Sequence, residues 1–430
     1  MEILRYPSRQ QWSALCQRAL ASQAAEVKNI VADIINQVRI NGDAAIKAYE
    51  QRFTGAVLDS LKVSEQEIAE AEQLVCDELK QAIIAANDNI ARFHAAQKMQ
   101  PVIVETAPGI SCTQKAVPIA KVGLYIPGGN SPLFSTVLML ATPARIAGCR
   151  EIILCTPAGK DGKVHPAILF AAHIAGVSNI YKTGGAQAIA AMAYGTETIP
   201  GVYKIFGPGN RFVMEAKQQV SQDAVAIDMP AGPSEVMVIA DDNANAEFVA
   251  ADFLSQAEHG PDSQSILLTT SSRLVDELPK CIDKMLDMLP RREMMEKSLS
   301  HSRIILLENT DRIMEFSNAY APEHLIINHA DADVLCQQVE NAGSVFVGPL
   351  SPESAGDYAS GTNHTLPTSG YATAYSGVNL DSFCKKITFQ KLTEQGIKSI
   401  GRTVEIMAEN EDLNAHKLAM TLRIEAVNND

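Results

Sequence analysis

The residues with the clearest chemical potential are Gln256 and His259, in the segment Ser-Gln-Ala-Glu-His-Gly-Pro at 255–261. The segment follows an alanine-rich apolar run and ends in Gly-Pro, a pattern typical of the last turn of a helix. Side chains three positions apart on a helix lie on the same face, so the two could bind one metal ion together. A histidine near a helix end is more often a surface residue or a partner of the helix dipole, so this pair alone does not establish a metal site.

Glu323 and His324 form a second candidate pair, directly before the apolar run Leu325–Ile327. Adjacent residues on a strand face opposite sides, so both can serve one site only if they lie in the loop before the strand, which Pro322 favours. There the histidine could abstract a hydroxyl proton while the carboxylate activates water. Surface decoration at a strand entrance is the alternative interpretation of this pair.

Two further segments contain candidate ligands. The small residues of segment 351–364 predict a close-packed functional loop, in which Asp357 and His364 are the best candidates for metal binding or proton transfer. Glu411 and His416 are five positions apart and would point about 140° from each other on one helix. If the helix begins after Glu411, His416 lies in its first turn, where the positive helix end favours the neutral, metal-binding imidazole.

Three glycine-rich turns follow predicted strands, at 123–129, 183–187 and 207–210. Glycine lets a ligand approach the backbone, and the helix that follows presents free N–H groups toward phosphate. A dinucleotide or a phosphorylated ligand would therefore fit. None of the turns matches G-x-G-x-x-G, because Phe212 stands where the last turn would need its third glycine. Ordinary tight turns between strand and helix are the alternative.

The composition is that of an α/β protein with more than one domain. The 430-residue length exceeds the roughly 250 to 300 residues of a single core. The net charge of −14 argues against nucleic acid and anionic membranes as partners, and it tolerates a cationic small substrate. Without a signal-peptide pattern or an apolar run of about 20 residues, we expect a cytoplasmic protein. The eight scattered cysteines predict neither disulfides nor a structural zinc module.

The hydrophobic pattern divides the chain into a helical part, two α/β series and a tail. Residues 9–98 are predicted helical, because apolar residues recur at three- and four-residue spacing. From Lys121, short apolar runs alternate with Gly/Pro turns, which is typical of βαβ units around a parallel sheet. The predicted strands are 121–126, 151–155, 179–182, 202–206 and 224–228 in the first series, and 235–240, 264–270, 303–307, 324–328 and 344–348 in the second. This pattern favours two sheets over one, followed after about residue 373 by a helical tail.

Six motifs, taken in order, resemble those of the histidinol dehydrogenase family. They are Gly-Pro-Gly-Asn at 207–210, Asp-Met-Pro-Ala-Gly-Pro-Ser-Glu at 228–235, Ser-Gln-Ala-Glu-His-Gly at 255–260, Pro-Glu-His-Leu at 322–325, Glu-Ser-Ala-Gly-Asp-Tyr at 353–358 and Gly-Thr-Asn-His at 361–364. The resemblance covers nearly the whole chain, including its length and the Ala-His-Lys at 415–417. Several independent motifs in the same order argue against chance agreement.

The resemblance implies oxidation of L-histidinol to L-histidine through L-histidinaldehyde, in two successive NAD-dependent hydride transfers, as the final step of histidine biosynthesis. It implies a cytoplasmic homodimer with one zinc ion per subunit, and neither a nucleic acid nor a membrane partner. The implied fold is α/β, with two Rossmann-like three-layer domains of parallel-rich sheets, as in aldehyde dehydrogenases, plus small helical terminal segments. The expected divisions are an N-terminal helical arm (1–22), a discontinuous first domain with the zinc and catalytic residues (23–120 and 236–375), an NAD-binding domain (121–235) and a C-terminal helical tail that reaches the partner subunit (376–430).

The family's site residues can be carried onto positions of matching type in this chain. The zinc ligands would be Gln256, His259, Asp357 and His416 of the partner subunit; glutamine is an unusual zinc ligand. Glu323 and His324 would be the acid–base pair, with His324 taking the hydroxyl proton and Glu323 activating the water that hydrates the aldehyde. The remaining assignments are Ser234, His364 and, from the partner, Glu411 in the substrate pocket, where the zinc ligands and His324 also contact substrate, and Tyr125, Gln187 and Asn210 in the NAD site.

Two other functions stay open at this point. A zinc hydrolase in which Glu323 activates metal-bound water would use the ligands but leave three glycine turns without a role. A small-molecule binding protein, or an inactive relative with structural zinc, would need no acid–base pair. Formation of NADH from histidinol and NAD separates a dehydrogenase from both.

Overall fold

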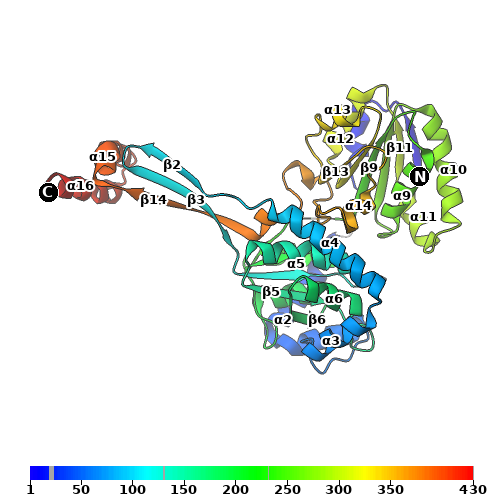
Figure 1. Cartoon of the computed structure of the whole chain (residues 1–430), viewed down its shortest axis with the longest axis horizontal. Coiled ribbons are helices and arrows are strands. Elements are labelled where there is room, and N and C mark those ends of the chain that lie inside the picture. The colour runs from blue at the N-terminus through cyan, green and yellow to red at the C-terminus, as the bar shows by residue number, and fades with distance from the viewer. Residues whose placement is uncertain (19–23, 129–130, 231, 430) are drawn as a thin grey trace. The chain divides into compact units, whose positions relative to one another are not determined.

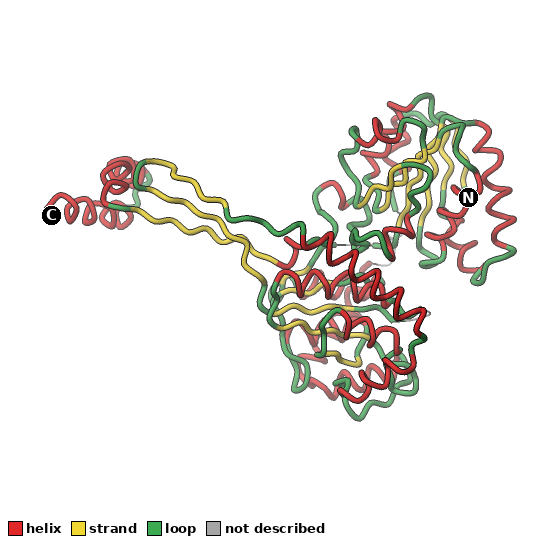
Figure 2. Tube along the Cα trace, in the orientation of Figure 1, coloured by secondary structure: helices red, strands yellow, loops and turns green. Residues whose placement is uncertain are grey.

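The computed structural model describes residues 1–18, 24–128, 131–230 and 232–429. Residues 19–22 of the expected N-terminal arm, Gly129 of the first glycine turn and Ala231 of the second motif lie outside the described residues. The chain divides into two compact units, one of Met1–Ala96 and Ile119–Phe383 and the other of Gln97–Pro118 and Cys384–Asp430. Each unit is described by itself below, with the labels of Figure 1 and the secondary structure of Figure 2.

The first unit alternates strands and helices. Its strands are β1 (Glu2–Arg5), β4 (Lys121–Tyr125), β5 (Glu151–Thr156), β6 (Asn179–Lys182), β7 (Lys204–Phe206), β8 (Ala226–Ile227), β9 (Glu235–Ala240), β10 (Gln264–Thr269), β11 (Arg303–Leu306), β12 (His324–Asn328) and β13 (Ser344–Val347). Its helices are α1 (Arg9–Leu15), α2 (Ala24–Phe53), α3 (Glu65–Leu74), α4 (Asp77–Ala95), α5 (Phe134–Ala147), α6 (Pro166–Ile174), α7 (Gly185–Tyr194), α8 (Arg211–Val220), α9 (Ala246–Ala257), α10 (Ser272–Leu286), α11 (Arg292–Ser300), α12 (Thr310–Tyr320), α13 (Ala332–Cys336) and α14 (Glu353–Tyr358), with the 3-10 helices η2 (Tyr371–Thr373) and η3 (Leu380–Phe383).

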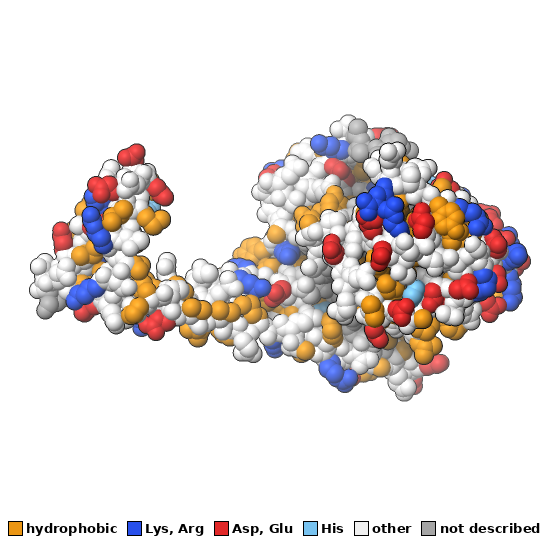
Figure 3. Space-filling model, turned by 90° about the horizontal axis from the view of Figure 1, so that it is seen from above, with side chains coloured by type: hydrophobic (Ala, Val, Ile, Leu, Met, Phe, Trp, Pro, Cys, Tyr) orange, Lys and Arg blue, Asp and Glu red, His pale blue; other side chains and the backbone are white. Residues whose placement is uncertain are grey.

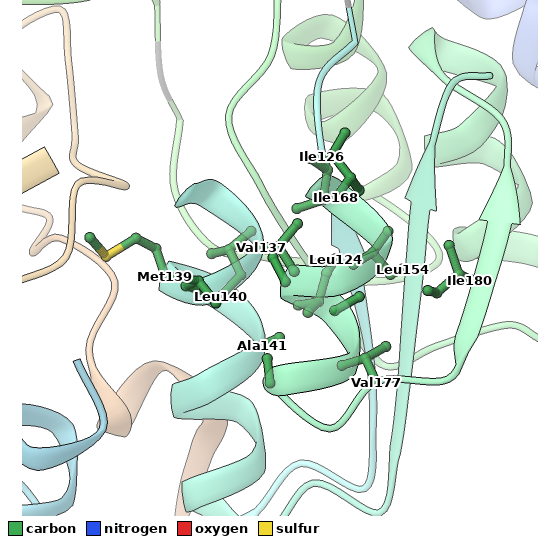
Figure 4. Packing of buried hydrophobic residues seen from close by; sticks show 14 of the residues in the cluster. Leu124, Ile126, Val137, Met139, Leu140, Ala141, Leu154, Ile168, Val177 and Ile180 are labelled. Carbon is green, nitrogen blue, oxygen red and sulfur yellow. The ribbon is translucent and has the colours of Figure 1, made fainter. Parts of the chain in front are cut away.

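The first sheet has the order β6-β5-β4-β7-β8, and all its strands are parallel. Successive side chains along each strand point to opposite faces of the sheet, and helices cover both faces. On one face α3, α4, α5 and α6 pack over residues such as Leu124 and Leu154, the cluster shown in Figure 4. On the other face α2, α7 and α8 pack over Ile153 and Ile205. The result is one three-layer α/β domain.

The second sheet has the order β1-β11-β10-β9-β12-β13 and is also parallel throughout. Helices α9, α10 and α11 cover the face that carries Val236 and Val238, and α1, α12 and α13 cover the face of Met237 and Ile239. The residues of β9, β10 and β12 are all buried, as expected for parallel strands covered on both sides. The predictions of two three-layer α/β domains and of ten parallel strands are confirmed, with small differences at the strand ends.

The helices α2, α3 and α4 differ in placement from the expected domain grouping. They contact elements of the β4–β8 sheet, with Val31 and Ile46 of α2 in one core cluster and Ile83 and Ile90 of α4 in the other. The sequence analysis grouped residues 23–120 with 236–375 instead. An amphipathic pattern shows that a helix has a buried face, but it does not show which sheet that face covers. The expected arm at 1–22 is not wholly helical, because Glu2–Arg5 form strand β1 beside β11. Residues 97–118, expected in the first domain, belong to the second unit, where their strands pair. The remaining domain boundaries stay a prediction.

The second unit is a three-stranded antiparallel sheet with two helices. The sheet order is β14 (Cys384–Leu392), β3 (Ile110–Pro118) and β2 (Val102–Ala107), followed by α15 (Glu394–Asn410) and α16 (Asn414–Asn429). The expected tail at 376–430 is therefore only partly helical. Because β14 is rich in lysine and largely exposed, it has no apolar run to reveal it, and its pairing with a strand far away in sequence stabilises it.

Surface and helix properties agree with the composition. On the face shown in Figure 3, acidic and basic side chains are interspersed. None of the described helices combines the length and the apolar character that crossing a membrane requires.

Candidate active site

Glu323 and His324 lie where the central strand β12 begins. β12 pairs with β9 on one side and β13 on the other, so polar side chains can reach a cavity only at its ends. His324 is the first residue of the strand, Glu323 ends the preceding loop, and both side chains are buried. The predicted position at a strand entrance is confirmed, although His324 begins the strand and only Glu323 lies in the loop before it. Burial of both side chains excludes the alternative of surface decoration.

One residue contacts both side chains through its backbone. The N–H of Glu235, at the start of β9, donates to Oε2 of Glu323 at 2.8 Å, and its carbonyl oxygen lies 3.2 Å from Nδ1 of His324. A carbonyl oxygen can only accept, so Nδ1 carries a hydrogen, and in the neutral imidazole the free lone pair is therefore on Nε2. Nε2 is buried and has no hydrogen-bond partner among the described residues. His324 is therefore arranged to accept a proton at Nε2.

Helix α14 adds two carboxylates to the pair. Glu353 and Asp357 are four positions apart and share one face of the helix. Oε1 of Glu353 lies 3.4 Å from Nδ1 of His324, and Oδ1 of Asp357 lies 3.6 Å from its Nε2. Segment 351–364, predicted as a loop, thus contains a helix, and Glu353 is a site residue that the sequence pattern did not indicate. The sequence feature that could have indicated Glu353 is the Glu-x-x-x-Asp spacing directly after Pro352, because a proline at this position is typical of the start of a helix.

Helix α9 brings Gln256 and His259 to the same place. Gln256 lies in the last helical turn and is fully buried, whereas His259 follows the C-cap and is exposed. Ligand atoms of His259, Glu353 and Asp357 all lie within 4.8 Å of one another, and α9 contacts α14. Segments near residues 256 and 357, distant in sequence, thus meet in one site.

Buried polar atoms without partners show that this site fits a metal ion. Six of the ten such side-chain atoms among the described residues belong to Gln256, His324, Glu353 and Asp357. A buried polar atom without a partner costs free energy, more so if it is charged. Amide oxygen, imidazole nitrogen and carboxylate oxygen are ligands of divalent metals. The donor set is therefore suited to a divalent cation such as zinc.

The electrostatics of the cluster point the same way. Burial raises the pKa of Glu323 and of Glu353 to about 8. Burial opposes a charge on His324, but the carboxylates of Glu353, Glu323 and Asp357 outweigh it and hold the pKa of His324 well above its ordinary value. Burial would raise the pKa of Asp357, but contact with His324 lowers it. The cluster thus attracts positive charge.

His364 and Ser234 lie at the edge of the same cluster. Nδ1 of His364 donates to the backbone carbonyl of Asp357 at 2.9 Å, and Nε2 lies 3.2 Å from Oγ1 of Thr136 on α5. Burial lowers the pKa of His364. Ser234 directly precedes Glu235 and is half-buried. Apart from the NAD residues, the structure therefore brings the predicted site residues of the first unit together around Glu323 and His324.

The three predicted NAD residues line one large cavity. Tyr125, Gln187 and Asn210 follow or end β4, β6 and β7, and the cavity at these carboxyl ends has a volume of about 1690 Å³. Ligand pockets typically measure roughly 300 to 1,000 Å³, so a dinucleotide has room. Carboxyl ends of parallel strands are the usual ligand site of such sheets.

A buried carboxylate that the sequence analysis missed holds one wall of this cavity. Oε1 of Glu50, on α2, accepts from the hydroxyl of Thr183, the N–H of Gly184 and Nε2 of Gln187, at 3.0, 2.8 and 3.0 Å. The hydroxyl of Tyr125 accepts from the N–H of the next glycine at 3.1 Å. Glu50 lies more than 130 residues from these partners, so no local pattern could reveal it.

The expectation that the helix after each glycine turn offers free N–H groups to phosphate is wrong at two of the three turns. Before α7, Glu50 binds the N–H of Gly184 and the hydroxyl of Tyr125 accepts from the next amide, and at α8 Asn210 accepts from two amides. These groups already satisfy donors that a Rossmann fingerprint leaves for pyrophosphate. The missing G-x-G-x-x-G is consistent with this arrangement.

Glu411 and His416 belong to the second unit. Glu411 is the C-cap of α15, His416 lies in the first turn of α16, and both are exposed. The predicted position of His416 in a first helical turn is confirmed. Their contribution to a neighbouring subunit stays a prediction.

Comparisons with known proteins agree with one another. A family model described as histidinol dehydrogenase matches residues 17–424. A histidinol dehydrogenase from Bacteroides thetaiotaomicron is 59% identical over 424 residues, covering 99% of each chain, and one from Escherichia coli K12 is 51% identical over 420 residues, covering 97% of this chain and 96% of the other. The crystal structure of histidinol dehydrogenase from Elizabethkingia anophelis has 51% identity, a TM-score of 0.96, and coverage of 100% of this chain and 99% of that one.

Proposed function

This chain belongs to the histidinol dehydrogenase family, and we propose that it oxidises L-histidinol to L-histidine in two successive NAD-dependent hydride transfers, the final step of histidine biosynthesis. The first transfer converts the alcohol to the aldehyde. Water then adds to the aldehyde, and the resulting diol loses the second hydride. Each transfer also releases one proton, so the site needs a base that works twice.

His324 is the proposed base for the hydroxyl proton. Its Nδ1 hydrogen is directed to the carbonyl of Glu235 at 3.2 Å, so in the neutral imidazole the lone pair that can accept a substrate proton is on Nε2. This is the single observation that carries the assignment, because a general base must present a free acceptor within hydrogen-bond reach of the proton it removes. Asp357 lies 3.6 Å from Nε2, so the positive imidazolium that forms has a carboxylate beside it.

Glu323 is the proposed base for the hydration step. One oxygen is fixed by the N–H of Glu235, which leaves the other to take a proton from water as that water adds to the aldehyde. Burial raises the pKa of Glu323 to about 8, and a base is most effective when its pKa lies near the working pH. The absence of a covalent intermediate in this scheme fits the lack of a cysteine among the described residues of the cluster.

Gln256, His259 and Asp357 are the proposed zinc ligands of this chain, and the buried amide and carboxylate atoms without partners support them. When bound, zinc would act chiefly as a template and Lewis acid that orients the amine and imidazole of histidinol. His364 would hold the substrate side of this cluster through its bond to the backbone of Asp357, and Ser234 would contact substrate from the start of β9.

Tyr125, Gln187 and Asn210 are proposed to bind NAD in the large cavity of the β4–β8 sheet. Tyr125 and Glu50 fix the turn before α7, and Glu50 orients the amide of Gln187. A zinc hydrolase would have no use for a dinucleotide-sized cavity, so this cavity favours the dehydrogenase.

We propose that a second copy of the chain supplies His416 and Glu411. Both are exposed at the junction of α15 and α16. The same two helices and their connection expose large apolar side chains, which favours burial against a partner: Ile406, Met407, Leu413, Leu418 and Leu422.

The direct test follows NADH absorbance after addition of L-histidinol and NAD to the purified protein with zinc. Two NADH per histidinol consumed are expected. One NADH per histidinol would mean an ordinary alcohol dehydrogenase, and none would refute the proposed function.

A further inference from the structure

We propose that Arg18 and Glu235 form a positioning unit that sets the geometry of Glu323 and His324. The inference rests on the proposed function, which gives those two residues the proton transfers. Neither Arg18 nor the Glu235 side chain was expected to have a role in the site.

The backbone of Glu235 contacts both members of the catalytic pair. Its N–H and its carbonyl oxygen belong to one residue, and they bind Glu323 and His324 respectively. A rotation or shift of this residue would therefore move both partners at once. It would also release Nδ1 of His324 and so remove the contact that assigns the free lone pair to Nε2.

The side chain of Glu235 is held at both carboxylate oxygens. Nε and Nη2 of Arg18 donate to Oε1 and Oε2 of Glu235 at 2.9 and 3.0 Å, a bidentate pair of the strong, geometrically specific kind. The N–H of Ser369 donates to the same Oε1 at 2.9 Å. Both oxygens are therefore occupied, and the start of β9 has little freedom to turn.

Arg18 also binds the segment leading to the catalytic pair. Nη2 donates to the carbonyl of Tyr320 at 2.8 Å, and the guanidinium lies 3.7 Å from the centre of the Tyr320 ring. The next residue, Ala321, has a φ of 53°, a left-handed conformation that is unfavourable for a residue other than glycine. Arg18 thus holds both segments, β9 and the loop into β12, that carry the contacts of Glu323.

The burial of this ion pair favours a positioning role over simple stabilisation. The Glu235 side chain is 2% exposed and that of Arg18 17%. Burying an ion pair costs desolvation, and apolar residues of similar size often stabilise a fold equally well. What an apolar pair could not supply is a fixed orientation of the Glu235 backbone.

The negative charge of Glu235 gives a second readout. Burial is the main cause that raises the pKa of Glu323; the charge of His324 and the N–H of Glu235 lower it, and the carboxylates of Glu235 and Asp357 raise it. Loss of Arg18 leaves the charge of Glu235 uncompensated, so the pKa of Glu323 should rise further. The ascending limb of the kcat–pH profile should then move to higher pH, because Glu323 must be ionised to act as a base.

The test compares Arg18→Met, Arg18→Lys and a matched control, Arg303→Met. Arg303 binds the carbonyl of Leu15 and the carboxylate of Glu2, so its loss weakens the same N-terminal segment without contacting Glu235. We expect Arg18→Met to lower kcat about ten- to a hundredfold and to shift the ascending limb upward. Zinc content should stay at the wild-type level and the KM for NAD within about twofold.

Arg18→Lys restores the charge but not the two-pronged contact. We expect the pH limb to return to the wild-type position while kcat stays low. This variant also serves if Arg18→Met does not fold, since it leaves no uncompensated charge.

Wild-type kcat in Arg18→Lys, or equal effects of Arg18→Met and Arg303→Met on kcat and on the pH limb, would overturn the positioning role. Failure of the proposed function looks different, because the wild-type protein would then form no NADH from histidinol. If the wild-type protein is active and the Glu323→Gln variant is active as well, Glu323 has no part in the mechanism. That result would count against the role of Glu323 and not against the contacts of Arg18.

Discussion

Replacement of Glu353 by Gln should stabilise the metal-free protein and at the same time weaken zinc binding. Glu353 is 1% exposed, and neither of its carboxylate oxygens has a hydrogen-bond partner. In the metal-free protein its negative charge is therefore unfavourable, whereas a bound cation would be attracted to it. Glutamine has nearly the same shape and carries no charge, so the substitution isolates the charge.

The pKa of Glu353 sets the size of the effect. Burial raises that pKa from 4.5 to about 8, so at pH 7 the folded metal-free protein keeps a proton that the unfolded chain has released. With 1.36 kcal/mol for each tenfold change, the difference between 4.5 and 7 corresponds to about 3 kcal/mol. The sign follows: the contribution of Glu353 to the stability of the wild type is most favourable below pH 4.5 and falls as pH rises toward 8, and the variant lacks this loss.

The assay is urea unfolding of EDTA-treated wild type and Glu353→Gln between pH 5 and 8. The variant should gain up to about 3 kcal/mol over the wild type at pH 7 and little at pH 5. Zinc affinity, measured by competition with a chelator, should fall about ten- to a hundredfold. Glu258→Gln is the matched control, because Glu258 is an exposed glutamate next to His259, and it should change neither quantity appreciably.

The argument from buried charge would be refuted if the Glu353→Gln protein were less stable than the wild type at pH 7. It would also be refuted if the difference in free energy of unfolding between the two proteins were the same at every pH. Unchanged zinc affinity would show that Glu353 plays no part in binding the cation.

His324→Ala and, separately, Glu323→Gln should each lower histidinol turnover by about a hundredfold or more, with zinc per subunit unchanged by metal analysis; undiminished turnover would exclude that side chain from proton transfer. His416→Asn should lower zinc occupancy, and mixing it with the Glu323→Gln protein should restore part of the activity if subunits share sites; verified mixed dimers without recovery would contradict the sharing. Burial lowers the pKa of His94, so the unfolded chain gains a proton first as pH falls below about 6.5, and the wild type should lose more stability between pH 6.5 and 5 than His94→Gln does in thermal unfolding. Equal losses in the two proteins would contradict this role of His94.

Local patterns predicted the parallel strands well but not every element. The runs 236–240 and 325–327 are apolar throughout, and they form most of β9 and β12, which are buried on both faces. β14 was missed because its lysines and its exposure look like a helical or loop segment, and only pairing with β3 reveals it. The same reason explains α14, whose six residues contain too few apolar positions to show a period.

Most candidate ligands could be predicted because their chemistry is local. Gln256 and His259 are three apart at a helix end, and Glu323 and His324 open an apolar strand. Glu353 was missed although it lies in a quoted motif, because a lone glutamate at a helix start has an ordinary role as a favourable charge at the helix N-terminus.

The amino-acid sequence by itself determined the family, the two parallel sheets and the identity of most candidate site residues, since motif order, hydrophobic period and side-chain type are all local properties. Only the tertiary structure decided which nitrogen of His324 is free, that Arg18 and Glu235 hold the catalytic pair, and that α2 supplies Glu50 to the cavity of the first sheet. These features depend on contacts between segments separated by some 90 to 220 residues. A local sequence pattern does not show which distant segments will be in contact.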